Sequence, residues 1–183
     1  MNAPVDSANE IAEYRRYFDS IYIAGIPRLL NDDGAFLSFI AVVTGMEALA
    51  GLCAPSKPNG ERFKDFVKSY YPAEYQPFVE KLWELRNAVI HCFHPGPFAL
   101  THHASWAHLK LQGEAIVLNA EDFYAALLFA SKQYFGALES SSALQQAFRK
   151  RVASSNGGAM QVHSAAATSS LPPNTSLERT REG

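Results

Sequence analysis

The sequence predicts a mainly helical, all-α fold, an up-and-down helical bundle with a small β-hairpin before the last long helix. The first observation is that apolar residues recur at helical spacing in successive segments, as far as about residue 150. The second is that a strand-like alternation is confined to a short stretch, 106–118. The third is a globular composition, since 48% of the 183 residues are hydrophobic and 19% are charged. We therefore expect one helical domain over residues 1–153.

Charge and cysteine content narrow the classes of function. The chain carries 16 Lys+Arg against 18 Asp+Glu, a net charge of −2, which argues against a broad surface for neutralising phosphates. Any contact with nucleic acid is expected to be local. Two cysteines, Cys53 and Cys92, are too few for a secreted disulfide framework, and Met1–Glu10 does not resemble a secretory signal. We expect a cytoplasmic protein.

The first helix is predicted to begin at Ser7, because Ser7–Glu10 has the S-x-x-E pattern of a capping box. The second is predicted over Ala35–Ala54, which is apolar nearly all round and about as long as a bilayer crossing. Its one charge is Glu47, a carboxylate that would be costly in lipid, and no basic cluster flanks it. We therefore expect a core helix of the bundle and no membrane span.

Two further helices are predicted after the loop 55–60, over Glu61–Tyr71 and over about Phe78–Phe93, with prolines between them. The second of these is amphipathic. One side carries the apolar residues Phe78, Leu82, Leu85 and Val89, and the opposite side carries Glu80, Glu84, Asn87 and His91.

The hairpin is predicted from an alternation over 106–111, a turn at 112–114 and a partner strand at 116–118. Asn119 is then expected to cap a long helix with a break at 140–142. The buried stripe of that helix is predicted to be Phe123, Leu127, Ala130, Tyr134 and Leu138. From Ser154 to residue 183 the composition turns to Ser, Ala, Gly, Thr and Pro, which predicts a disordered tail.

The fourth predicted helix carries the sequence Arg86-Asn87-Ala88-Val89-Ile90-His91, an R-N-x-x-x-H motif. It resembles the motif of HEPN-domain ribonucleases. The segment 39–49, with Glu47 followed closely by Leu49, is similar to the upstream helix of Apea-like and abortive-infection HEPN proteins, and 82–85 is similar to the family's lead into its motif. The resemblance covers about residues 36–93. The chain departs from many members at Cys92-Phe93, where a small residue usually follows the histidine.

The residue types of the motif suit RNA cleavage on their own chemistry. His91 can act as general acid or base on a ribose 2′-hydroxyl or a departing 5′-oxygen, and Arg86 can stabilise the added charge on phosphorus. Asn87, one turn before His91, can orient the imidazole or hold a phosphate oxygen. Glu47, alone in an apolar helix, needs a partner, and Arg86 or His91 is the expected one. Neither a metal nor any other cofactor is required.

The resemblance implies an endoribonuclease that leaves a 2′,3′-cyclic phosphate and acts as a homodimer with a composite site. Arg86 and His91 are five residues, hence about 140°, apart around one helix, so we expect a second copy to bring them together. The apolar strip that includes Trp83 and Ile90 is the expected dimer contact. Toxin and phage-defence roles are common in this family. Whether this chain has an antitoxin or other protein partner is left open by the sequence.

Alternatives remain open at this point. Arg86 and Glu47 can serve only to hold two helices in register, and HEPN relatives include RNA-binding and dimerising members without catalysis. The histidines at 91, 94, 102, 103 and 108, with Cys92, suggest zinc by residue type, but no C-x-x-C or H-E-x-x-H pattern occurs, so we expect no metal site.

Overall fold

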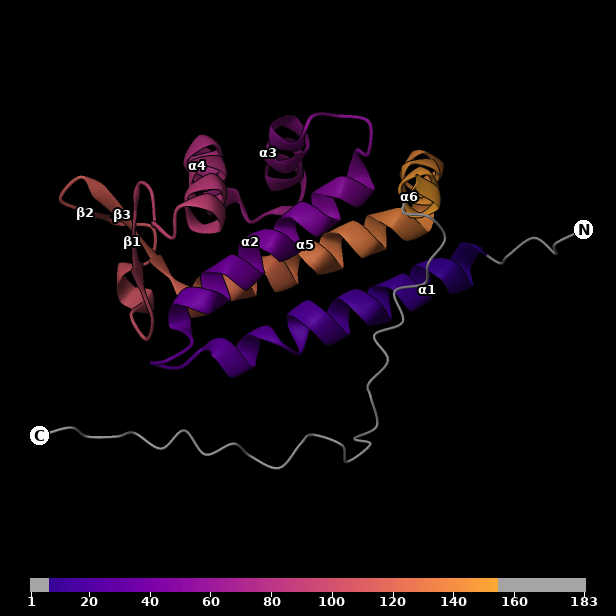
Figure 1. The fold of residues 1–183 in the computed structure, drawn as a ribbon. Coiled ribbons are helices and arrows are strands. Elements are labelled where there is room, and N and C mark those ends of the chain that lie inside the picture. Colours follow the sequence, from indigo (N-terminus) through magenta and orange to yellow (C-terminus); the bar gives the residue numbers. More distant parts are fainter. Residues whose placement is uncertain (1–6, 155–183) are drawn as a thin grey trace, which may run out of the picture.

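The computed structural model describes residues 7–154, and their side chains from Asn9 onward (Figure 1). It is mainly helical with one small sheet, as predicted. The helices are α1 Ser7–Phe18, α2 Ala35–Cys53, α3 Asn59–Tyr70, α4 Val79–His91, α5 Ala120–Ser140 and α6 Ser142–Ser154, and the strands are β1 Phe98–Thr101, β2 Leu111–Gln112 and β3 Ala115–Asn119.

The bundle is built around α2, which contacts α3, α4, α5 and α6. In Figure 1, α1, α2 and α5 lie alongside one another, whereas α3, α4 and α6 cross them, so an up-and-down arrangement holds only for α1, α2 and α5. By length and composition α2 is long and apolar enough to cross a membrane, yet 56% of its most apolar window is buried inside the fold. Contacts on most of its sides explain why it is apolar nearly all round, as expected of a core helix.

Short helical turns connect α1 to α2 and α3 to α4. After α1 the chain makes a π-helical turn, Asp19–Ile23, and a 3₁₀ turn, Ile26–Leu29, before the bend that leads into α2. Another 3₁₀ turn, Ala73–Phe78, follows α3 and contains Pro77, so α4 begins one residue after the predicted start.

The sheet has the strand order β1-β3-β2. β2 and β3 form the predicted antiparallel hairpin, with Gly113 at positive φ in its turn. The predicted first strand over 106–111 is wrong for most of its length, because Ser105–Ala107 forms a 3₁₀ turn and Leu109 has a φ of 57°. β1, which pairs in parallel with β3, was not predicted: four residues after a Pro-Gly-Pro segment are too few to show alternation.

Asn119 stands at the start of α5, as predicted, but its side chain makes no capping bond. It is fully buried, and its Oδ1 accepts a hydrogen bond from the backbone N–H of Ala104 at 2.9 Å. Its amide donates to Oδ2 of Asp122 at 2.6 Å and to Oγ of Ser105 at 3.3 Å. The expected capping role is therefore wrong, because the loop after β1 occupies the amide instead.

The last two helices agree with the sequence pattern. All five residues predicted for the buried stripe of α5 are buried, and Ser141 separates α5 from α6 near the predicted break. Ser154, where the predicted tail begins, is still the last residue of α6. The remainder of that predicted disordered segment, 155–183, lies outside the described residues.

Candidate functional site

The structure places Glu47 of α2 beside Arg86 of α4. Nε and Nη2 of Arg86 donate to the same carboxylate oxygen, Oε2, at 2.9 and 2.6 Å. Only 13% of the Arg86 side chain and 21% of the Glu47 side chain are exposed. Charge-assisted hydrogen bonds in such a sheltered pair are strong, so Glu47 fixes the plane of the guanidinium.

The third guanidinium nitrogen of Arg86 joins the other two motif residues. Nη1 donates to Oδ1 of Asn87 at 3.0 Å and lies 3.3 Å from Nε2 of His91. Because arginine is only a donor, Nε2 has to accept in this contact, which requires a neutral imidazole with its proton on Nδ1. All four predicted site residues are therefore brought together within one chain.

This arrangement corrects the expectation that Arg86 and His91 point apart on one helix. The angle between their positions on the helix is large, but the long arginine side chain spans it, and Glu47 holds its end in place. A second copy of the chain is not needed to bring the two side chains together.

The apolar strip that was expected to form the dimer contact is partly buried within the chain. The ring of Trp83 packs against Phe63 of α3, with 5.6 Å between ring centroids. The Trp83 ring also contacts Arg86, because Cζ of Arg86 lies 5.3 Å from the ring centre, a cation–π contact. Ile90 also packs on the core. The packing of α3 on α4 therefore takes up part of this strip, and the expected dimer contact stays a prediction.

The start of α3 contributes two features that sequence reasoning missed. Nδ2 of Asn59 lies 3.5 Å from Oε1 of Glu47, the oxygen that Arg86 does not use. A Cβ on Gly60 would come within 3.2 Å of the Trp83 ring, so glycine there permits the close packing of α3 on α4. The sequence signal was the turn-forming Pro58-Asn59-Gly60, which we assigned to a loop.

The open side of the cluster faces solvent. His91 is exposed, and Asn87 is partly exposed. Just beyond the end of α4, Phe93 is 76% exposed and has a φ of 51°. A bulky residue in the left-handed region is a genuine outlier, and here it follows the helix end, where the N–H of Cys92 and that of His94 both point to the carbonyl of Ala88.

The two cysteines differ in exposure, and the expectation that both are packed thiols is wrong for Cys92. Cys53 is partly buried at the end of α2, and burial raises the pKa of its thiol, which suits a packing residue. Cys92 is exposed beside His91. Within residues 7–154, the clustered metal-ligating groups are Asp32, His102 and His103, and neither Cys92 nor His91 belongs to the cluster.

Comparison with known proteins leaves the family open. No family model, no curated protein and no solved structure matches this chain. The likeness to HEPN domains therefore rests on the motif and on its surroundings in this chain.

Proposed function

We propose that this protein is a metal-independent endoribonuclease of the HEPN type, with His91 as general acid or base and Arg86 as phosphate ligand. The observation that supports it is the joint position of Arg86, Asn87 and His91, with Nη1 of Arg86 within 3.3 Å of Nε2 of His91. An exposed neutral imidazole beside a fixed guanidinium is the pair of groups that cleavage at a ribose 2′-hydroxyl needs.

In the proposed reaction, Nε2 of His91 takes the proton of the 2′-hydroxyl as its oxygen attacks the adjacent phosphorus. The bond from phosphorus to the 5′-oxygen breaks, and that oxygen leaves with a proton from an acid. The products are a 2′,3′-cyclic phosphate and a 5′-hydroxyl. Nη1 of Arg86 exchanges its present contacts for a phosphate oxygen, while Glu47 keeps the other two nitrogens in place.

Phe93 would supply a stacking surface next to this centre. It lies two residues beyond His91, its ring is mostly exposed, and its backbone conformation is unfavourable for a bulky residue. RNA-binding proteins commonly stack unpaired bases on exposed aromatic rings. We therefore place a base of single-stranded RNA against Phe93.

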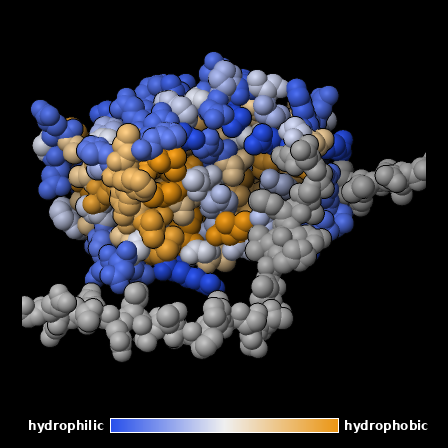
Figure 2. Space-filling view, viewed as in Figure 1, coloured by the Kyte–Doolittle hydropathy of each residue, from blue (hydrophilic) through white to orange (hydrophobic). Residues whose placement is uncertain are grey.

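We further propose that a second copy of the chain supplies the acid, its own His91, as the family resemblance implies. The surface offered for that copy is one side of α2, which we call the α2 strip. Leu37 is 53% exposed and lies on the same side of α2 as Ile40, Thr44 and Glu47. Figure 2 shows apolar surface gathered over the area where Figure 1 draws the first half of α2.

A non-catalytic RNA-binding or interaction module is the second candidate. The observation in its favour is that Glu47 occupies two of the three Arg86 nitrogens, as in a pair that only holds helices in register. Such a module would bind RNA or a protein through the same exposed face of α4.

The test is cleavage of single-stranded RNA in EDTA by the full chain and by His91→Ala. The matched control is His94→Ala, which removes an exposed histidine three residues away. We expect cyclic-phosphate ends from the wild type and the control, and a loss of at least about 100-fold in His91→Ala, the usual contribution of a general base. Circular dichroism checks that each variant is folded.

Equal cleavage by His91→Ala and the wild type would contradict the proposal. RNA binding that weakens with salt, without cleavage by any folded variant, would establish the non-catalytic candidate instead.

A further inference from the structure

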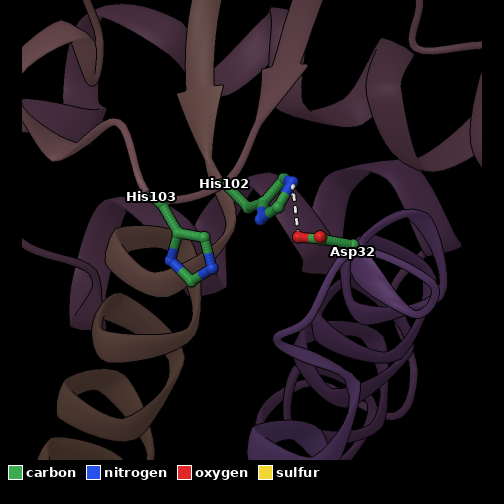
Figure 3. Close-up of side chains that lie close together, drawn as sticks. All are labelled: Asp32, His102 and His103. Atoms are coloured by element: carbon green, nitrogen blue, oxygen red, sulfur yellow. Dashed lines mark ion pairs between the residues drawn. The ribbon is translucent and has the colours of Figure 1, made fainter.

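Three metal-ligating side chains from two distant parts of the sequence meet on one side of the sheet. They are Asp32, in the turn before α2, and His102 and His103, in the loop after β1 (Figure 3). One ligand atom from each lies within 4.8 Å of the others. Oδ1 of Asp32 is 3.7 Å from Nε2 of His102, and the two imidazole centroids are 4.6 Å apart.

Hydrogen bonds to Asn119 and Glu121 fix the loop that carries both histidines. Asn119 binds the backbone N–H of Ala104 and the hydroxyl of Ser105, so the segment after His103 is anchored to the start of α5. The backbone N–H of His103 lies 3.2 Å from each carboxylate oxygen of Glu121. These bonds keep His103 at a φ of 55°, an uncommon conformation that places its ring next to that of His102.

The turn that carries Asp32 is ordered in a similar way. Oδ1 of Asn31 accepts from the backbone N–H groups of Asp33 and Gly34, at 3.1 and 2.8 Å. Asp32 itself projects outward and is 90% exposed. The carboxylate is therefore presented by a formed turn toward the two imidazoles.

The hydrogen bonds of the imidazoles leave nitrogens available for a ligand. Nδ1 of His103 is 2.8 Å from Oε1 of Glu121, which leaves Nε2 of that ring for another partner. Metal-binding histidines commonly donate their second ring N–H to a carboxylate in this way. Nε2 of His102 lies 3.7 Å from Oδ1 of Asp32, so this is the nitrogen of that ring that faces the carboxylate.

We propose that Asp32, His102 and His103 bind a divalent transition-metal ion, zinc foremost, with Glu121 positioning His103 and water completing the coordination. Two imidazoles and one carboxylate are a donor set that zinc accepts, whereas calcium and magnesium prefer oxygen alone. Tetrahedral zinc keeps its ligand atoms about 3.4 Å apart, so side-chain movements of about 1 Å close the site.

The ion would act as a clamp, apart from the chemistry proposed at Arg86 and His91. It joins the turn before α2 to the loop after β1, two segments that are seventy residues apart in the sequence. Because binding to the folded chain alone raises its stability, zinc should raise the unfolding temperature.

The test measures zinc affinity of the tag-free full chain by calorimetry, and the unfolding temperature with zinc and with EDTA. The variants are Asp32→Ala, His102→Ala and His103→Asn, since asparagine tolerates the positive φ of that position. The controls are His94→Ala and His163→Ala, which remove histidines elsewhere in the sequence. We expect affinity to fall by at least about tenfold in each site variant and to stay within about twofold in the controls.

Circular dichroism in EDTA shows whether a site variant has lost zinc binding only because it no longer folds. Cobalt provides a second readout, because its visible absorption bands become intense when a protein binds it in tetrahedral geometry, and we expect those intense bands to disappear in folded His102→Ala. No zinc binding by the wild type, or equal affinity in the folded site variants and the wild type, would overturn the proposal.

Discussion

At the scale of one residue, His108 is a histidine with a structural role, since both of its ring nitrogens make hydrogen bonds within the fold. The backbone N–H of Asn119 donates to its Nδ1 at 3.1 Å, so the proton of the neutral ring is on Nε2, which lies 2.9 Å from the hydroxyl of Tyr75. That hydroxyl in turn donates to the carbonyl of Asp122 at 3.3 Å. His91 differs, because its ring is exposed and contacts Arg86. The partners of a histidine, more than its presence, separate a structural role from a catalytic one.

The pH dependence of stability follows from the His108 network. Burial lowers the pKa of His108 below its ordinary value of 6.5, although the carboxylates of Asp122 and Glu74 oppose the shift. Below that value the unfolded chain therefore binds more protons than the folded chain, and stability falls as the pH drops. Stability from this group is complete above pH 6.5 and is lost as the pH falls toward the lowered pKa.

We expect urea unfolding to show this loss between neutral pH and mildly acidic pH in the wild type. The loss should be smaller in His108→Gln, which has no titrating ring, and unchanged in His94→Gln. An identical pH dependence in His108→Gln and the wild type would show that another group is responsible.

At the scale of the element, α2 shows how a helix that is apolar all round is packed. Gly45 lies close to both α5 and the turn after α1, since a Cβ there would be 3.0 Å from Cδ2 of Leu127 and 3.1 Å from the Tyr22 ring. Gly51, on the same helix, would meet nothing closer than 3.6 Å, at Arg151. The two glycines therefore serve different purposes.

These two positions give a matched pair of substitutions. Gly45→Ala should lower the free energy of unfolding by roughly 1 kcal/mol, because the cost of overpacking exceeds the gain in helix propensity. Gly51→Ala should raise it by about 0.5–1 kcal/mol, the usual gain when alanine replaces glycine inside a helix. Chemical denaturation of both variants checks this, and a stabilising Gly45→Ala would mean that Leu127 and Tyr22 move aside easily.

At the scale of the whole molecule, the proposed dimer depends on the α2 strip and its exposed residue Leu37. Light scattering at micromolar concentration should report a dimer for the wild type and a monomer for Leu37→Glu, because a carboxylate on the strip opposes its burial. Because Leu37→Glu is expected to lose the dimer, its RNA cleavage should fall as well. Leu111→Glu, at a 72% exposed position on the sheet, is the control and should leave both unchanged. A wild-type monomer with full cleavage activity would refute the composite site.

The sequence by itself determined the features that depend on residues close together along the chain. The helices, the buried stripe of α5 and the break before α6 follow from apolar spacing and from turn-forming residues, which act on neighbours along the chain. The residues of the motif, and the need of Glu47 for a partner, could be identified for the same reason: a charge in an apolar helix is costly alone.

The tertiary structure decided everything that depends on which segments meet. It alone showed that Arg86 reaches both Glu47 and His91 within one chain, and that α3 packs against Trp83. Likewise, the parallel pairing of β1 with β3 and the meeting of Asp32 with His102 could not be inferred from spacing. The physical reason is that contacts between distant segments depend on how helices and strands pack together, and periodicity along the chain carries no record of that packing.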